Sequence, residues 1–289
     1  MPASSRAFWL PRRGYDPADY EDAFAANAVA GRFAVADGAT EGCFTDLWAR
    51  LLVNDFVAGS ACEVTSWPAS LPALQDRWAS DVSARRLPWY AESSVSQGAF
   101  AAFLGLVLSN SPLLPGEAGA NSPLLPGEGQ GVRETYPRLS TPETPAVQPP
   151  GEVQGARESC CWQAVAVGDS CLLHTCDNVL VRAFPLERGE QFDNFPKLVG
   201  SRMSVKNVAA RQSLWLDGQG RPGDRLWMMT DALAHWCLAE NEAGKNPWND
   251  LESLLTLPES QDPFVSLVEG LRDRGKLRND DVTLLAIEL

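Results

Sequence analysis

A short apolar run that ends in an Asp-Gly pair constrains the fold of this chain more than any other stretch. Residues 33–36 read Phe-Ala-Val-Ala, and Asp37 and Gly38 follow directly. An apolar run of this length that ends in a turn is typical of a buried strand. Because Gly38 has no side chain, the backbone can turn sharply there and leave its carbonyl uncovered. The stretch predicts two oxygen ligands at one strand end, of the kind that Mg²⁺ or Mn²⁺ takes, although Asp-Gly is also a common turn.

Further acidic residues lie at the ends of other apolar runs. They are Glu21 with Asp22, Asp169 after the run 164–168, Asp231 after the run 225–230, and Asp280 with Asp281 before the run 282–289. Each position is a weak signal by itself. If they gather at one point, the ionised carboxylates repel one another and need a cation.

The order of these elements resembles the metal-dependent protein phosphatases of the PP2C type. The family pattern is an ED pair, a VADG turn, GDS, TD, and a terminal DN or DD before a strand. All five occur here, as Glu21-Asp22, residues 35–38, Gly168-Asp169-Ser170, Thr230-Asp231 and Asp280-Asp281. The match runs from Glu21 to the C-terminus, and the order and spacing of the five elements make it specific.

The resemblance implies two Mg²⁺ or Mn²⁺ ions. Asp37 would bridge both ions, and Asp231 and Asp280 would complete the shell of one of them. The Gly38 carbonyl would bind the other ion. A water held between two such ions loses a proton at neutral pH and can attack phosphorus, so no Cys or Ser nucleophile is required.

The remaining acidic residues have more peripheral roles in the family. Glu21 and Asp22 would act mainly through metal-bound water, and Asp169 matches a position linked to a third, weaker ion.

Two departures from the family pattern concern the substrate. Residues 39–42 read Ala-Thr-Glu-Gly, so the His that eukaryotic members carry after the turn is absent. The Arg that often precedes the ED pair by four residues and grips the phosphate is replaced by Pro17. Arg12 and Arg13 are candidates for that role.

His235 shares a helix face with Asp231 and could transfer a proton, but a structural or surface role is the main expectation.

The chain is expected to form one α+β domain over residues 1–289. Strand-like runs cover 21–26, 32–37, 98–108, 160–167, 225–230 and 282–289, and helical spacing covers 43–58, 67–92, 232–240 and 262–274. The resemblance implies two packed antiparallel sheets flanked by helices on both outer sides.

Residues 109–158 hold nine of the 21 Pro and an eight-residue repeat at 110–117 and 121–128. They are predicted to be a disordered insertion, with a Pro-rich docking segment as the alternative.

Charge and composition exclude several classes of partner. The chain has 24 basic and 37 acidic side chains, a net charge of −13, which argues against nucleic acid and anionic membranes. Its seven Cys lack a CxxC pair, no apolar run could span a membrane, and no secretion signal is visible, so a cytoplasmic location is expected.

The sequence therefore predicts a metal-dependent phosphatase, acting as a monomer on phosphoserine or phosphothreonine of a protein and opposing a Ser/Thr kinase. A small-molecule phosphoesterase is one alternative. The other is a phosphopeptide-binding adaptor of the same fold that has lost turnover.

Overall fold

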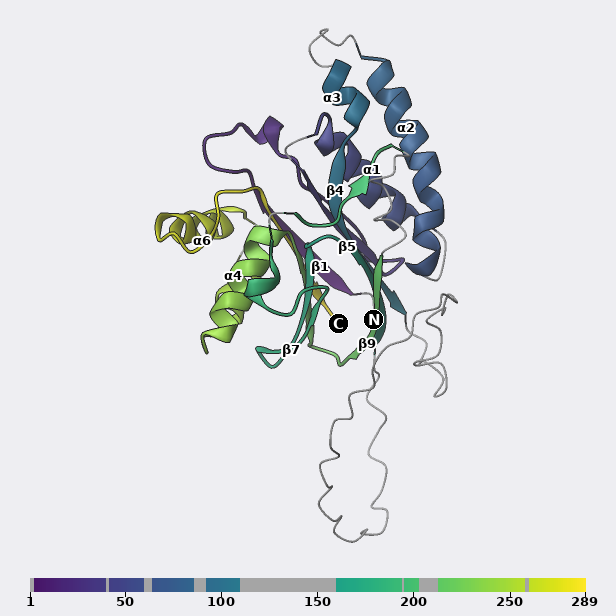
Figure 1. Ribbon diagram of the computed structural model, residues 1–289. Helices are drawn as coiled ribbons and strands as arrows, with labels where there is room; N and C mark the ends of the chain where they lie inside the picture. Colours follow the sequence, from purple (N-terminus) through teal and green to yellow (C-terminus); the bar gives the residue numbers. More distant parts are fainter. Residues whose placement is uncertain are drawn as a thin grey trace, which may run out of the picture.

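Two antiparallel sheets pack face to face in the computed structural model, with helices on both outer sides (Figure 1). The structure describes residues 3–39, 42–59, 64–85, 92–109, 160–193, 195–202, 213–257 and 260–289. This is the α+β sandwich that the resemblance implied. The insertion predicted at 109–158 lies outside the described residues, apart from Ser109, which ends a strand.

The first sheet has five strands in the order β1-β11-β10-β6-β7. Their bounds are Ser4–Leu10 for β1, Val282–Glu288 for β11, Arg225–Met229 for β10, Cys171–Cys176 for β6 and Val179–Phe184 for β7. Because β10 and β11 are antiparallel neighbours, Met229 pairs with Leu284. The start of β11 therefore lies beside the end of β10.

The second sheet has six strands, with the order β2-β3-β4-β5-β9 and β8 paired to β4. The bounds are Ala23–Asn27 for β2, Arg32–Gly38 for β3, Phe100–Ser109 for β4, Cys160–Val167 for β5, Leu214–Gly220 for β9 and Val199–Gly200 for β8. The predicted hairpin of β2 and β3 is present, and β4 lies between β3 and β5, as its continuous apolar sequence indicates.

The helices form the two outer layers. Helices α1 (Thr45–Ala58) and α2 (Leu71–Ser83) pack on the six-stranded sheet, and α3 (Glu92–Gln97) precedes β4. Helices α4 (Asp231–Glu242), α5 (Trp248–Thr256) and α6 (Asp262–Asp273) pack on the five-stranded sheet. Figure 1 shows α1 and α2 on one side of the strands and α4 and α6 on the other. No helix in the described ranges is long and apolar enough to cross a membrane.

Strand alternation divides the core into layers. Along β3, Phe33 and Val35 are buried between the two sheets, whereas Ala34 and Ala36 belong to the cluster beneath α1 and α2. Successive side chains of a strand point to opposite faces. Asp37 is therefore on the same side of β3 as Phe33 and Val35, at the end of the space between the two sheets.

Several elements lie outside the strands and helices expected from the sequence, among them β1, β9 and α5. In β1 only Phe8 is buried, and β9 is largely exposed, so neither shows a strong apolar pattern.

The chain also crosses from β5 in one sheet to β6 in the other at the turn that contains Gly168 and Asp169.

Candidate active site

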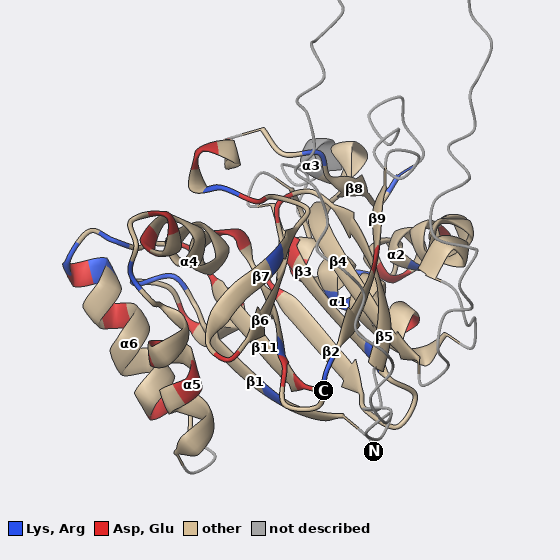
Figure 2. Cartoon of the chain, turned by 90° about the horizontal axis from the view of Figure 1, so that it is seen from below, with Lys and Arg blue, Asp and Glu red and all other residues tan. Residues whose placement is uncertain are grey.

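The charges of Asp22, Asp169, Asp231 and Asp280 all act on Asp37, so these predicted acidic residues lie near one another. Figure 2 shows acidic positions, in red, in the region between α4 and the strands. Asp37 ends the inter-sheet face of β3, and Asp22 directly precedes β2. Asp231 is the first residue of α4, and Asp280 lies just before β11. Segments far apart in the sequence thus bring their carboxylates together, because antiparallel pairing places these strand ends side by side.

Gly38 is required by the close approach of the neighbouring backbone. A Cβ on Gly38 would lie 2.6 Å from the Glu21 carbonyl oxygen and 3.1 Å from the Thr45 Cβ. A larger residue would push the Glu21-Asp22 segment away from the end of β3. The glycine therefore keeps Asp22 and Asp37 on adjacent strands at the same level of the sandwich.

Asp22 is buried, and one of its oxygens is held by the hydroxyl groups of Thr230, at the start of α4, and Thr283, in β11. Its Oδ2 accepts hydrogen bonds from Thr230 Oγ1 at 3.0 Å and from Thr283 Oγ1 at 2.7 Å. Thr283 Oγ1 also hydrogen-bonds the Tyr20 hydroxyl. The Oδ1 atom of Asp22 is buried and has no hydrogen-bond partner among the described residues. The network thus fixes the carboxylate and leaves one oxygen unsatisfied.

Asp231 and Asp280 share one basic partner. The Arg278 Nη2 atom contacts Asp231 Oδ2, and it lies 2.9 Å from Asp280 Oδ2. The other Asp280 oxygen accepts from the Asp281 backbone N–H at 3.0 Å. Asp231 Oδ1 is buried without a hydrogen-bond partner in the described part of the chain.

Burial and mutual repulsion raise the pKa values of Asp22, Asp37 and Asp231. Burial is the main cause of the raised pKa of Asp37, and the charges of Asp22 and Asp231 raise that pKa further. Burial likewise holds the pKa of Asp22 well above its ordinary value. Charged carboxylates at these positions are unfavourable without a compensating cation.

Glu21 lies at the edge of this cluster between two partners. Its Oε1 accepts from Thr45 Oγ1 at 2.8 Å, and its Oε2 pairs with Arg12 Nη2 at 3.1 Å. The Arg12 guanidinium also lies 4.0 Å from the centre of the Tyr15 ring. Arg12 thus lies beside the site, whereas Arg13 pairs with Glu269 and Asp273 of α6.

Asp281 holds the backbone of two loops. Its Oδ1 accepts from the Arg12 backbone N–H at 2.8 Å, and its Oδ2 accepts from the Glu21 backbone N–H at 2.7 Å. Both oxygens of Asp281 are therefore used to orient the segments that carry Arg12 and Glu21.

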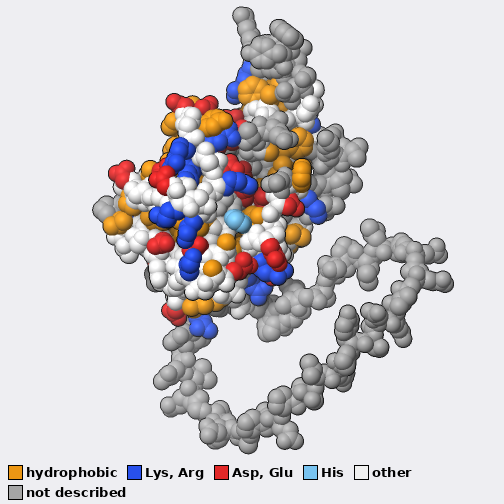
Figure 3. Space-filling view, turned by 60° about the vertical axis from the view of Figure 1, so that its left-hand side comes forward, with side chains coloured by type: hydrophobic (Ala, Val, Ile, Leu, Met, Phe, Trp, Pro, Cys, Tyr) orange, Lys and Arg blue, Asp and Glu red, His pale blue; other side chains and the backbone are white. Residues whose placement is uncertain are grey.

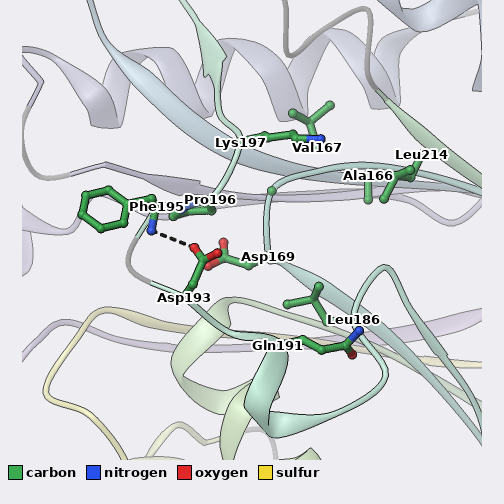
Figure 4. Close-up of a pocket in the computed structure, with 11 residues that line it drawn as sticks. Ala166, Val167, Asp169, Leu186, Gln191, Asp193, Phe195, Pro196, Lys197 and Leu214 are labelled. Atoms are coloured by element: carbon green, nitrogen blue, oxygen red, sulfur yellow. Dashed lines mark hydrogen bonds between the residues drawn. The ribbon is translucent and has the colours of Figure 1, made fainter. Parts of the chain in front are cut away.

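Asp169 lines a cavity beside the cluster (Figure 4). The cavity has a volume of about 250 Å³, and its walls include Gly168, Leu186, Asp193, Phe195 and Lys197. Figure 4 shows the Asp169 and Asp193 carboxylates side by side, and Asp193 Oδ1 accepts from the Phe195 backbone N–H at 2.8 Å. Burial, with the Asp231 charge as the next cause, raises the pKa of Asp169 to about 7.

The turn at Gly168 brings Asp169 to this position. Gly168 has a φ of +99°, and a Cβ there would lie 2.6 Å from the Ala102 Cβ and 2.9 Å from the Lys197 carbonyl oxygen. Only glycine combines that backbone conformation with such close neighbours.

Neither histidine contacts an acidic residue of the candidate site in the contacts that the structure shows. His174 pairs with Asp224 at 2.9 Å in a buried part of β6, and the ring of His235 packs against Phe192. These contacts are structural.

The residues present fit divalent cations. The donor set consists of carboxylate and carbonyl oxygens, the ligands that Mg²⁺ and Mn²⁺ prefer. Asp22 Oδ1 and Asp231 Oδ1 are buried acceptors that lack partners, which such an ion would satisfy directly or through water. As placed, no three acidic, His or Cys side chains of the described residues are grouped closely enough to hold an ion, and a guanidinium lies between Asp231 and Asp280.

Five residues of the site were not singled out from the sequence. They are Tyr20, Thr45, Asp193, Arg278 and Thr283. Most have partners far away in the chain, so no local pattern identifies them. Thr283 and Arg278 lie within three residues of Asp280, and that proximity is the only sequence signal that could have drawn attention to them.

Comparison with known proteins identifies the fold. No protein-family model matches the chain, and no curated protein matches it in sequence. Among solved structures, the Mycobacterium tuberculosis serine/threonine phosphatase PstP/Ppp is 13% identical with a TM-score of 0.55, over 100% of this chain and 99% of that chain. The catalytic domain of PstP in complex with two manganese ions is 14% identical with a TM-score of 0.53, over 99% and 97%. The PPM Ser-Thr phosphatase MsPP from Mycobacterium smegmatis, in complex with cacodylate, is 15% identical with a TM-score of 0.52, over 99% and 98%. The chain therefore has the fold of the PP2C-type serine/threonine phosphatases, as the order of its acidic pairs predicted.

Proposed function

We propose that this protein is a metal-dependent phosphatase that hydrolyses phosphoserine and phosphothreonine on proteins. The observation that carries the proposal is the convergence of Asp22, Asp37, Asp231 and Asp280 from separate elements, with buried oxygens of Asp22 and Asp231 left without partners. A buried acidic cluster of this kind is costly in a fold unless it serves to bind cations. Solved structures of the same fold carry the names of Ser/Thr phosphatases, which supports this substrate class.

The chain's own residues would prepare the site for two Mg²⁺ or Mn²⁺ ions. Asp37 would be the shared ligand, Asp231 and Asp280 would hold one ion, and the Gly38 carbonyl would hold the other. Bound divalent ions supply an activated water and neutralise charge on the phosphoryl oxygens. Thr230 and Thr283 orient Asp22 through its Oδ2, and Asp281 positions Glu21 through the backbone. Asp169 and Asp193 would provide a third, weaker cation site.

The surroundings of the site agree with a phosphorylated protein as substrate. The cavity beside Asp169 combines apolar walls from Leu186 and Phe195 with acidic groups, so it could accept a side chain next to the phosphorylated residue. On the face shown in Figure 3, basic and acidic side chains are interspersed, which does not favour a long polyanion. We infer that the protein opposes a Ser/Thr kinase and acts as a monomer.

The Asp37→Asn variant tests this function. Wild-type protein should hydrolyse para-nitrophenyl phosphate and a phosphothreonine peptide with Mn²⁺, and a chelator should abolish both activities. Asp37→Asn should lose turnover and bind Mn²⁺ more weakly while its circular dichroism stays unchanged. Asp217→Asn, the same change at an exposed position of β9, is the matched control. Near-normal turnover of Asp37→Asn, or wild-type turnover in chelator, would reject the proposal.

One observation favours a second candidate, a phosphopeptide-binding adaptor of the same fold. Arg278 already supplies a positive charge to Asp231 and Asp280. In that case the wild-type protein would bind the phosphothreonine peptide without hydrolysing it, whether or not Mn²⁺ is present. A small-molecule phosphoesterase would instead hydrolyse para-nitrophenyl phosphate and leave the phosphopeptide intact.

A further inference from the structure

Arg278 bridges two of the carboxylates that we assign to metal binding. Its Nη2 atom contacts Asp231 Oδ2 and lies 2.9 Å from Asp280 Oδ2. The guanidinium side chain is 52% exposed, so it lies at the mouth of the site rather than beneath it. Arg278 lies in the loop between α6 and β11, and within the described part of the chain its guanidinium pairs with these two carboxylates.

A divalent cation and the guanidinium compete for the same oxygens. Arg278 Nη2 lies between Asp231 Oδ2 and Asp280 Oδ2, where an ion shared by these two oxygens would lie, and two cations so close together repel each other strongly. An ion bound by Asp231 and Asp280 would therefore displace Arg278 from both. The side chain is long and exposed, so its charge would remain at the mouth of the site.

The two arginines proposed from the sequence, Arg12 and Arg13, have different partners. The Arg12 side chain is only 14% exposed and lies between Glu21 and the Tyr15 ring. Arg13 pairs with Glu269 and Asp273 on α6. Pro17 occupies the position where a phosphate-binding arginine was expected. Of the basic side chains that contact the acidic cluster, Arg278 has the greater access to solvent and to an entering substrate.

We propose that Arg278 exchanges partners. It binds Asp231 and Asp280 when these carboxylates hold no metal ion, and it binds the phosphoryl group of the substrate once a divalent ion has taken them. The planar guanidinium suits this second role because it donates two parallel N–H groups to phosphate oxygens. Arg278 would thus supply the phosphate contact that the substitution at Pro17 removes. This inference rests on the proposed phosphatase function.

Two equilibrium measurements test the exchange without relying on turnover. The variants are Arg278→Gln and Arg278→Lys, with Arg274→Gln as the control, because Arg274 is an exposed arginine at the end of α6. Calorimetric titration measures Mn²⁺ binding to the metal-free protein. Equilibrium dialysis measures binding of inorganic phosphate to the Mn²⁺-saturated protein.

Loss of the guanidinium should affect the two equilibria in opposite directions. Arg278→Gln should bind Mn²⁺ about tenfold more tightly, since a competing cation is removed. It should bind phosphate about tenfold more weakly, since a charge-assisted contact is lost. Arg278→Lys should lie between Arg278→Gln and the wild type in both measurements, because it keeps the charge without the planar fork. Arg274→Gln should match the wild type.

Either unchanged equilibrium would overturn the proposal. Unchanged Mn²⁺ affinity in Arg278→Gln would show that the guanidinium does not compete for Asp231 and Asp280. Tighter Mn²⁺ binding with unchanged phosphate affinity would show that Arg278 has no contact with substrate. The variants could show both expected changes in affinity while the wild type hydrolyses no phosphoester. The phosphatase function would then fail, and the exchange of partners would stand.

Discussion

At the scale of single residues, the two adjacent aspartates before β11 have different partners although they form one pair in the sequence. Asp280 contacts Arg278 through one oxygen, and Asp281 accepts from the backbone N–H groups of Arg12 and Glu21. Asp281 thus orients the loops around the site, and the proposed ligand of the pair is Asp280.

This difference predicts unequal effects of mutation. Asp280→Ala should lower the turnover rate by several orders of magnitude, since removal of a ligand affects both the nucleophile and charge neutralisation. Asp281→Asn keeps one acceptor oxygen, so it should cost about 1–3 kcal/mol of stability and far less activity. Thermal unfolding and Mn²⁺-dependent kinetics on both variants check this. Equal losses of activity in the two variants would contradict the assignment.

Most acidic residues of the candidate site could be predicted from the sequence, whereas Asp193 and supporting residues such as Thr283 could not. Asp37 and Asp231 each follow an apolar run, and that local pattern identifies a strand end. Thr230 and Thr283 hold Asp22, which lies more than two hundred residues earlier in the chain. Only the pairing of β10 with β11 and the packing of the sheets bring these groups together.

At the scale of secondary-structure elements, buried strands were predicted and exposed ones were missed. β3 and β4 are buried on both faces and have continuous apolar sequences. β1 and β9 lie at sheet edges, where one side of the strand meets solvent and polar residues are tolerated. Helix α5 has only nine residues, three of them buried, so its apolar period repeats too few times to be recognised in the sequence. A buried strand or helix needs apolar residues in a regular pattern, which can be recognised in the sequence. Elements at the edge of a sheet bury few residues and therefore show little of this pattern.

The end of β3 depends on the absence of a side chain at residue 38. Gly38→Ala should lower the free energy of unfolding by about 1–3 kcal/mol, because the new Cβ would meet the Glu21 carbonyl. It should also weaken Mn²⁺ binding, because the Glu21-Asp22 segment must move.

Gly270→Ala is the control for this change. Its Cβ would meet only the flexible end of Arg274 on α6, so it should stabilise the protein by roughly 0.5–1 kcal/mol. Chemical denaturation of both variants gives the comparison. A Gly38→Ala protein as stable as the wild type would show that the backbone at this point can relax.

At the scale of the whole molecule, the insertion and the acidic cluster lie at opposite ends of β4. Asp37 pairs with Ala102 near the start of β4, and Ser109 ends the strand. Seven residues of strand separate the two points by roughly 23 Å. Ser109 also pairs with Cys161, so a short turn can join β4 to β5.

Replacing residues 110–158 with a short Gly-Ser turn should therefore leave activity and melting temperature nearly unchanged, since long loops add little to the closure entropy. The comparison requires Mn²⁺-dependent kinetics and thermal unfolding of the shortened chain beside the full one. A large loss of either property would mean that the replaced segment contacts the domain or the site.

The hydrogen bonds of Asp22 also have a mechanical consequence. Asp22 belongs to the segment that enters the six-stranded sheet, whereas its partner Thr283 belongs to β11 of the five-stranded sheet and its partner Thr230 precedes α4 directly after β10. Apolar contacts between the sheets have no preferred direction. The directional bonds to Asp22 therefore add resistance to shear at one end of the sandwich. The two layers would separate first at the other end, and the end that carries the candidate site would act as the pivot.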